Sequence, residues 1–496
     1  MVTFWRGSDA NRMDPHVKRV ATVIVLGSIM SVLDTTIVNI ALDTLSKDLH
    51  SSLSTIQWVV SAYLLALGAV IPLTGWAVRR FGAFAVYMQA LVMFTLGSAL
   101  CALSTSTSEL IAFRAFQGVG GGMLVPTGMV LLVQAAGPVH LPKVMAAIGV
   151  PMVLAPVVGP TLGGFLLQSV SWHAIFMINI PVGVVTAVVA TRLLPRQPPD
   201  GVGVRRLDWQ GLVLSGAGTV GIIYGLSKSA TAGSLTASSV VVPVVVGLAL
   251  LVVFVVRALR AEHPLLDMKL YRIKAYGSAS AVMFCLGAAM FGAMILLPLY
   301  FQVAQGQDAI RTGLLLIPQG VGAAVGMNRS AMATRRLGAG LTSLYGGLVM
   351  TAATVPFAFM GATTPYLDLA VPMVVRGVGI GLAIMPAFTA AFATLDDDQV
   401  TDASPQLNVI QRIGASFGTA VVAVVLQSKL THAGVAGAVD GASRAAAAFD
   451  GTYWWVMAMS VVALVPAVIM WRVERKVRAD GGPSAIPHEA LIEVAA

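Results

Sequence analysis

The chain has 496 residues, of which 57% are hydrophobic and only 11% are charged, and its formal net charge is +9. Because a soluble domain carries about 25% charged residues, this composition excludes a soluble protein and predicts that lipid faces much of the surface. A basic balance in a soluble protein would indicate nucleic acid. Here the lysines and arginines gather in short loops, as in the cytoplasmic loops of membrane proteins, so we expect no nucleic-acid partner.

The first predicted element is a membrane helix that follows a basic start. Four basic residues precede its apolar run: Arg6, Arg12, Lys18 and Arg19. A signal peptide begins in the same way, but this run continues for about 20 residues without a small-residue cleavage site. That length spans a bilayer, so we predict a transmembrane helix after a cytoplasmic segment at 1–19.

Similar apolar runs recur along the chain and predict an all-α polytopic membrane protein with fourteen transmembrane helices. They lie near 20–42, 55–78, 84–103, 110–134, 143–168, 173–194, 208–228, 238–257, 276–304, 311–332, 340–361, 368–392, 404–428 and 453–472. With the N-terminus inside, about 23 of the basic residues fall in cytoplasmic segments and about five in external loops. This asymmetry predicts an inner-membrane protein with both termini in the cytoplasm.

Two short strings recur at nearly the same offset and indicate an internal repeat. Ala77-Val-Arg-Arg-Phe-Gly-Ala83 resembles Ala333-Thr-Arg-Arg-Leu-Gly-Ala339. Gly118-Val-Gly-Gly-Gly-Met resembles Gly377-Val-Gly-Ile-Gly-Leu. Two parallel halves around a cavity are a transporter architecture, because rocking one half against the other alternates access to a midplane site.

The repeat therefore predicts a division of the chain into five segments. They are the N-terminal segment at 1–19, a six-helix half at 20–194, a linker with two extra spans at 195–275, a second six-helix half at 276–472 and a cytoplasmic tail at 473–496.

Asp34 lies well inside the first predicted span, in Leu33-Asp-Thr-Thr-Ile-Val-Asn-Ile-Ala41. A carboxylate at the centre of a membrane helix costs about 2.5–3.5 kcal/mol on insertion scales. It is either a proton-carrying or cation-binding acid, or a carboxylate that is hydrogen-bonded for packing alone. The rule for intramembrane acids favours the first interpretation. Thr35 and Asn39 lie four residues apart and are expected to line the same cavity.

Arg114, in Arg-Ala-Phe-Gln-Gly118 on the fourth predicted span, is the candidate countercharge of Asp34. Gln117 lies on the same helix face. The alternative is that Arg114 extends to the membrane interface. Arg376 precedes the glycine string of the second half, but polar loop residues lie close before it, so the interfacial interpretation gains weight there.

The fifth predicted span contains Pro156 and the string Gly159-Pro160-Thr-Leu-Gly163-Gly164. Pro160 cannot donate to the carbonyl of Pro156, so we expect the helix to bend here. Gly159 and Gly163 give one smooth face where another helix can approach closely. A bent helix with a small face suits a gate between two halves, and ordinary close packing is compatible with this interpretation.

Four acids lie at a predicted cytoplasmic loop: Asp396, Asp397, Asp398 and Asp402. They form a solvated face, or they pair with inner-loop arginines when the inner gate is closed. The sequence has no G-x-x-x-x-G-K-[ST] motif, so ATP does not drive the chain directly. It also has no H-E-x-x-H motif and no cluster of cysteine and histidine. We therefore expect no enzyme activity, no cofactor and no metal site.

On these motifs the chain resembles the fourteen-span drug:proton antiporter branch of the major facilitator superfamily, which includes bacterial multidrug exporters. The strings that begin at Leu33, Arg114 and Gly159 resemble the branch's first-helix, fourth-helix and antiporter motifs. Two further strings resemble signatures of later helices: Trp172-His-Ala-Ile-Phe-Met-Ile-Asn-Ile-Pro-Val-Gly183 and Leu297-Pro-Leu-Tyr-Phe-Gln302. The resemblance implies the major facilitator fold, with two parallel six-helix halves plus two inserted helices.

One loop departs from the family's pattern. The family normally has Gly-x-x-x-Asp-Arg-x-Gly after the second span, whereas this chain has Gly75-Trp-Ala-Val-Arg79-Arg80-Phe-Gly82. Arginine replaces the acid, so we expect the usual charge contact between the halves at this cytoplasmic gate loop to be altered or rebuilt. The acidic run at 396–398 is the candidate partner.

The resemblance implies a proton-coupled exporter of hydrophobic, often cationic, small molecules that functions as a monomer by alternating access. In it Asp34 is the acidic site, Arg114 the proton-relay partner and the Gly159–Gly164 helix the hinge. An exporter of one endogenous metabolite or lipid on the same fold is the alternative, and the sequence does not separate the two. A membrane enzyme or a channel would need a catalytic cluster or a continuous polar stripe, and we find neither.

Overall fold

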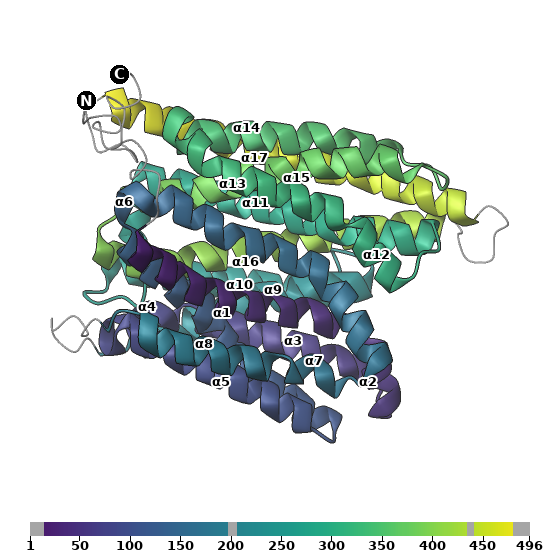
Figure 1. Cartoon of the computed structure of the whole chain (residues 1–496), viewed down its shortest axis with the longest axis horizontal. Helices are drawn as coiled ribbons and strands as arrows, with labels where there is room; N and C mark the ends of the chain where they lie inside the picture. Colours follow the sequence, from purple (N-terminus) through teal and green to yellow (C-terminus); the bar gives the residue numbers. More distant parts are fainter. Residues whose placement is uncertain (1–13, 197–205, 434–440, 480–496) are drawn as a thin grey trace, which may run out of the picture.

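The computed structural model describes residues 14–196, 206–433 and 441–479, and in these ranges it contains helices and no strands. The long helices run side by side, roughly along the longest axis of the molecule (Figure 1). Helices of this kind suit a bilayer, because each helix satisfies its backbone hydrogen bonds within itself. The all-α class predicted from the sequence is confirmed.

The helices fall into three groups in chain order. The first group comprises α1 (Pro15–Ile40), α2 (Leu42–Asp48), α3 (Leu53–Val70), α4 (Leu73–Phe81), α5 (Ala83–Leu103), α6 (Thr107–Ser169), α7 (His173–Met177) and α8 (Asn179–Leu193). The second comprises α9 (Trp209–Ala232) and α10 (Ser238–Arg260). The third comprises η2 (Met268–Arg272), α11 (Lys274–Leu299), η3 (Tyr300–Ala304), α12 (Ala309–Leu315), α13 (Ile317–Leu337), α14 (Ala339–Thr354), η4 (Val355–Phe359), α15 (Tyr366–Phe392), α16 (Asp397–His432) and α17 (Gly441–Ala479).

In the described ranges, ten helical segments are long and apolar enough to cross a membrane, and the bent pair α3–α4 makes an eleventh. The two helices of this pair meet at an angle of 58°. Pro72 lies at the break, and its missing N–H cannot bond to the carbonyl of Gly68. The span predicted at 55–78 is therefore broken rather than continuous.

Each of the fourteen predicted spans overlaps a helix, but three of them are not among these eleven. One is the second part of α6, which continues beyond Gly137, where φ of 59° and ψ of 176° interrupt the helical conformation. The other two are the spans at 208–228 and 311–332, which lie on α9 and on α12 with α13, rich in small and polar residues. The count of fourteen stays a prediction.

The two equivalent loops of the predicted repeat each contain a glycine, and the two glycines have nearly the same backbone conformation. Gly82, between α4 and α5, has φ of 82° and ψ of 148°. Gly338, between α13 and α14, has φ of 93° and ψ of 163°. Only glycine adopts such angles without strain, which explains why both double-arginine strings continue into a glycine.

The glycine strings of the repeat also pack in equivalent ways. A Cβ atom on Gly118 of α6 would lie 2.5 Å from the carbonyl oxygen of Tyr63 on α3. A Cβ atom on Gly377 of α15 would lie 2.2 Å from the carbonyl oxygen of Gln319 on α13. In both halves, therefore, the absence of a side chain lets two helix backbones approach closely.

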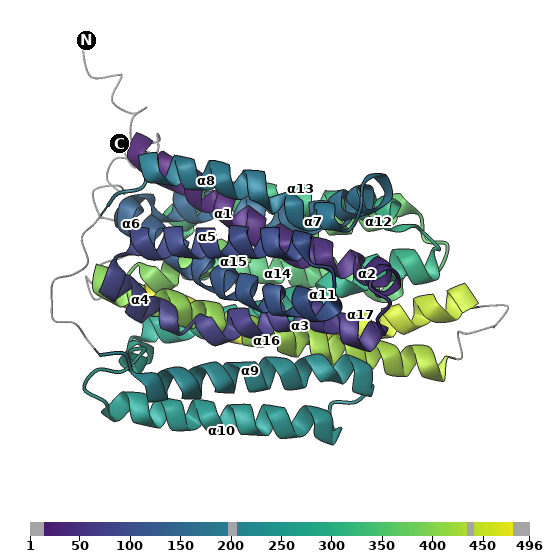
Figure 2. The same cartoon turned by 90° about the horizontal axis from the view of Figure 1, so that it is seen from below.

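The first and third groups of helices form two lobes, and the inserted helices pack outside them. In the first lobe α6 packs against α1, α3 and α5; in the second, α15 packs against α11, α13 and α14. The pair α9–α10 lies along one side of the molecule, where α9 contacts α3 and α16 (Figure 2). The exact boundaries of the five predicted segments stay predictions, and residues 1–13, 197–205 and 480–496 lie outside the described ranges.

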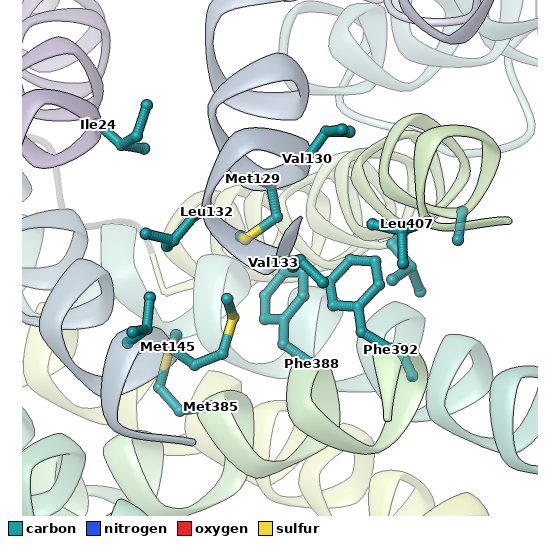
Figure 3. Packing of buried hydrophobic residues seen from close by; sticks show 14 of the residues in the cluster. Ile24, Met129, Val130, Leu132, Val133, Met145, Met385, Phe388, Phe392 and Leu407 are labelled. Atoms are coloured by element: carbon teal, nitrogen blue, oxygen red, sulfur yellow. The ribbon is translucent and has the colours of Figure 1, made fainter. Parts of the chain in front are cut away.

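The two lobes share one hydrophobic cluster near the end of the molecule that carries the double-arginine loops. Residues of α1 and α6 meet residues of α15 and α16 there (Figure 3). The labelled members are Ile24, Met129, Val130, Leu132, Val133, Met145, Met385, Phe388, Phe392 and Leu407. At the opposite end, two separate clusters each belong to a single lobe. The lobes are therefore closed against each other at the double-arginine end.

Candidate functional site

Asp34 and Arg114 form a buried ion pair inside the first lobe. Asp34 lies on α1 and is 1% exposed, and Arg114 lies on α6 and is 0% exposed. Arg114 Nη1 is 2.5 Å from Asp34 Oδ2. The α6 helix begins after Ser106, whose hydroxyl accepts the backbone N–H of Glu109, so Arg114 is placed two turns inside the helix. The sequence prediction that these two residues pair agrees with this geometry, and the interfacial alternative for Arg114 does not.

Two side-chain amides complete the surroundings of the carboxylate. Gln117 Nε2 donates to Asp34 Oδ1 at 3.0 Å, and Asn179 Nδ2 donates to the same oxygen at 3.1 Å. Both amides also donate to Ser98 Oγ on α5, at 2.6 and 3.1 Å. Arg114 Nη1 donates further to Gln117 Oε1 at 2.7 Å. The carboxylate is thus held by one cation and two neutral donors.

Aromatic rings and a backbone carbonyl hold the rest of the guanidinium. Arg114 Nε donates to the carbonyl of Val59 at 3.1 Å. The guanidinium carbon lies 4.1 Å from the ring centre of Tyr63 and 5.8 Å from that of Phe176, which are cation–π distances. The hydroxyl of Tyr63 lies 3.3 Å from that of Ser31 on α1. The network therefore ties together α1, α3, α5, α6 and α8.

The structure separates Asn39 from this network. Its side chain is exposed and donates to the carbonyl of Thr35 on its own helix, at 2.8 Å. Asn179 was missed as a site residue, although it lies in the sixth-helix string that carried part of the family resemblance. An asparagine inside an apolar run was the available signal. Ser98 and Tyr63 gave no signal, because either residue is common in a packed helix.

The glycines of the fifth predicted span contact α1 beside the buried acid. A Cβ atom on Gly159 would lie 2.1 Å from Thr36 Oγ1, and one on Gly163 would lie 3.1 Å from Ile37 Cγ2. Gly164 is buried as well. The side chains of Pro156 and Pro160 lie outside the described part of the chain, so the bend expected there stays a prediction.

The cytoplasmic gate loop contacts the second lobe through a charge pair. Arg79 on α4 forms an ion pair with Asp402 on α16, and its Nη2 donates to the carbonyl of Leu265 at 3.4 Å. A Cβ atom on Gly75 would lie 2.9 Å from Asp402 Oδ1, so the glycine lets the acid approach. Arg80 instead lies against the ring of Phe81, at 5.7 Å.

The acid opposite Arg79 is therefore Asp402 rather than the run at 396–398, which was the candidate in the sequence. Asp396 instead caps the start of α16: its backbone N–H donates to Gln399 Oε1 at 3.1 Å, as part of a capping box. Asp402 lies farther inside the helix, where it can face α4. The side chain of Asp397 lies outside the described part.

The described ranges give no support for a metal site or for a hydrolase active site. They contain no group of three or more histidine, cysteine or acidic residues that could hold a metal ion. The string Gly414-Ala-Ser-Phe-Gly418 has the G-x-S-x-G spacing of a hydrolase nucleophile motif, but it lies within α16 and not in a strand-to-helix turn. Gly414 and Gly418 instead lie against the backbone of α11.

The two lobes, their apolar surface and the buried charge network together define a multi-pass membrane transporter. The sequence profile of the Major Facilitator Superfamily matches residues 24–419. The chain belongs to this superfamily.

Named relatives extend along most of the chain. The "Multidrug resistance protein B homolog" of Mycobacterium tuberculosis is 38% identical over 425 residues, which are 85% of this chain and 78% of the relative. The "Putative multidrug resistance protein MdtD" of Escherichia coli O6:H1 is 29% identical and covers 91% of this chain and 93% of its own length.

Two solved structures share the fold. The human organic anion transporter MFSD10 (TETRAN) matches with a TM-score of 0.59 at 15% identity and covers 90% of this chain and 99% of its own. The proton:xylose symporter XylE matches with a TM-score of 0.61 at 14% identity and covers 93% and 96%. At these identities the similarity concerns the fold alone.

Proposed function

We propose that this transporter exports hydrophobic, often cationic, small molecules across the inner membrane in exchange for protons. The observation that supports this proposal most directly is the ion pair of Asp34 with Arg114, which is shielded from lipid and water inside the first lobe. The relatives named as multidrug resistance proteins support the choice of export and of a broad substrate range. The protein acts as a monomer, with both termini in the cytoplasm.

Because of the network around Asp34, protonation of this residue changes the contacts between helices. The ionised carboxylate accepts hydrogen bonds from α6 and α8. A proton on Asp34 removes the negative charge that balances Arg114, whose guanidinium stays charged. Because a buried charge without its partner is strongly destabilised, protonation favours a rearrangement of α1 against α6 and α8. This rearrangement is the step that links the proton to the movement of the lobes.

The glycine face beside Asp34 is the proposed hinge. Gly159 and Gly163 allow α6 to slide along α1 without steric conflict, and Gly164 extends the small face. Pro156 and Pro160 each remove a hydrogen bond from this part of the helix, which makes bending easier. Movement at Asp34 and bending of α6 would therefore occur at the same helix contact.

The gate on the cytoplasmic side is the proposed counterpart of this hinge. Gly75 and Gly82 shape the loop, Arg79 binds Asp402 of the other lobe, and Arg80 stays on its own lobe. The ion pair and the shared hydrophobic cluster both break when the lobes separate at this end. Opening to the cytoplasm therefore requires an energy input, which proton binding at Asp34 supplies.

Transport into inverted membrane vesicles tests the role of Asp34. A pH gradient, acidic inside, should drive accumulation of a lipophilic cationic dye by the wild type. Asp34→Asn keeps the size of the side chain but cannot cycle between charged and neutral forms, so we expect a loss of at least tenfold in gradient-driven uptake. The exposed acid Asp48 on α2 provides the control, and Asp48→Asn should retain wild-type uptake. Equal gradient-driven uptake by Asp34→Asn and the wild type would remove Asp34 from the mechanism.

A further inference from the structure

A second buried arginine, Arg376 on α15, lies in the other lobe and has no ion pair among the described residues. It is 1% exposed, and its Nη1 donates to Gln319 Oε1 on α13 at 3.2 Å. Its Nε and Nη2 atoms have no acceptor among the described residues. Because a guanidinium has five N–H donors and no acceptor, these atoms require electron-rich partners. Of the two interpretations that the sequence left open for Arg376, the buried side chain does not fit the interfacial one.

A tyrosine hydroxyl adds to this set of unused polar atoms. Tyr453 on α17 is 0% exposed, and its hydroxyl has no hydrogen-bond partner among the described residues. Tyr453 packs in one buried cluster with Leu369 and Met373 of α15, the helix that carries Arg376. The helices α13, α15 and α17 therefore each contribute a polar side chain to one buried region of the second lobe.

No described carboxylate balances this region. Among the described residues Arg376 forms no ion pair, and its hydrogen bond to Gln319 is to a neutral amide. Asp450 precedes Tyr453 by one turn of α17, but it accepts the backbone N–H of Met360, at 2.8 Å. In the first lobe, the carboxylate of Asp34 binds Arg114 directly and balances its charge. Since an unbalanced buried charge is costly, the second lobe needs a negative charge from elsewhere.

We propose that the second lobe binds a small monovalent anion, such as chloride, between Arg376, Gln319 and Tyr453. The anion accepts hydrogen bonds from the free N–H groups of Arg376 and from the hydroxyl of Tyr453. Charge-assisted hydrogen bonds of this kind are strong where little water competes. Because Arg376 and Tyr453 are almost completely enclosed, the site suits a monatomic ion better than an organic carboxylate. The bound anion fixes α13, α15 and α17 against one another.

This anion site is independent of the proposed proton coupling, and binding can be measured without transport. The test uses the purified full-length protein in detergent and compares its thermal unfolding in sodium chloride and in sodium gluconate at equal ionic strength. We expect chloride, and likewise bromide, to raise Tm by about 3 °C or more in a saturable manner. Equal Tm values in chloride and gluconate would show that the region holds water and would overturn the proposal.

Three variants assign the effect to this region. Arg376→Gln should abolish the chloride-dependent rise in Tm. Tyr453→Phe, which removes only the hydroxyl, should raise the half-saturating chloride concentration about fivefold. Arg444→Gln removes another arginine of the same lobe, on α17, whose exposed side chain donates to the carbonyl of Ala433, and it should keep the wild-type response. A chloride response that persists in Arg376→Gln contradicts the proposal. If Arg376→Gln does not fold, Tyr453→Phe decides, and an unchanged half-saturating concentration overturns the site.

Discussion

At the scale of single residues, Asn179 and Asn39 both lie in predicted membrane spans, but only Asn179 reaches the buried acid. Asn179 Nδ2 donates to Asp34, whereas Asn39 donates only to its own helix. A hydrogen bond to a charged group contributes about 1.5–3 kcal/mol, and 1.4 kcal/mol is a factor of ten. We therefore expect Asn179→Leu to lower gradient-driven transport about tenfold and Asn39→Leu to change it less than twofold. Initial uptake rates in inverted vesicles, normalised to the amount of folded protein, measure both effects.

A third variant tests whether the hydrogen bond that Asn179 donates to Asp34, rather than the size of the side chain, causes the effect. Asn179→Asp keeps the size but replaces a donor by an acid beside another acid, so it should lower transport more than Asn179→Leu does. If Asn179→Leu transports like the wild type while Asn39→Leu does not, the assignment of the network to proton coupling is wrong.

The charged members of the network were predictable from the sequence, as was Gln117, which lies one turn from Arg114 on the same helix face; the neutral members on other helices were not. Asp34 and Arg114 are conspicuous because an ionised group in an apolar span is costly and therefore rare. A serine such as Ser98 satisfies its hydroxyl in any helix, so its sequence position does not reveal a role. Asn39 was assigned to the site from its spacing to Thr35, but spacing on one helix gives a face and not the neighbour that the face meets.

At the scale of helices, the contact between α1 and α6 depends on Gly159. The added methyl group of Gly159→Ala would lie 2.1 Å from Thr36 Oγ1 and 2.9 Å from Thr36 Cβ. Since packed helices tolerate such overlap poorly, we expect a loss of about 1–3 kcal/mol in stability and a large loss of transport. Thr36→Gly removes the obstructing atoms, so the double variant should recover part of both. Thermal unfolding and vesicle uptake of both single variants and the double variant test this expectation.

Helix positions were predictable because long apolar runs have few alternatives in a membrane, and each predicted span overlaps a helix. Breaks within spans were harder to predict. Pro72 interrupts the span at 55–78, yet prolines also occur inside continuous helices such as α10 and α11. The residues around a proline, and not the proline alone, decide whether the helix bends sharply or stays nearly straight.

At the scale of the whole molecule, two export functions make different predictions for the cell. A broad exporter lowers the internal concentration of many compounds, so deletion of its gene should reduce the inhibitory concentrations of several unrelated hydrophobic cations, by about fourfold or more each. An exporter of one endogenous metabolite or lipid predicts accumulation of that compound and unchanged drug susceptibility. A susceptibility panel with the deletion strain, complemented by wild type or by Asp34→Asn, distinguishes the two. Complementation by Asp34→Asn equal to that by wild type would contradict proton-driven export.

The pair of Arg79 and Asp402 joins the two lobes at the closed end, with the charges placed opposite to the family's usual loop pattern. Arg79→Asp places two acids face to face and leaves Asp402 without its cation, which destabilises the state that is closed to the cytoplasm. We therefore expect Arg79→Asp to reduce transport at least tenfold and to increase labelling of a cysteine introduced at Ser404, which in the closed state donates to the carbonyl of Pro126. Asp402→Arg should have the same effect, because two arginines then face each other.

The double variant decides whether the pair acts through its charges or only through the positions of its side chains. Arg79→Asp combined with Asp402→Arg restores opposite charges across the lobe interface, so it should recover much of the transport and the low cysteine labelling of the closed state. The narrow space beside Gly75 limits this recovery, because the longer arginine must now lie where the aspartate approaches the glycine. Arg80→Asp serves as the control, since Arg80 lies on its own lobe and does not cross the interface. If the double variant is as impaired as either single variant while Arg80→Asp is active, the contact depends on shape rather than on charge, and an electrostatic gate is excluded.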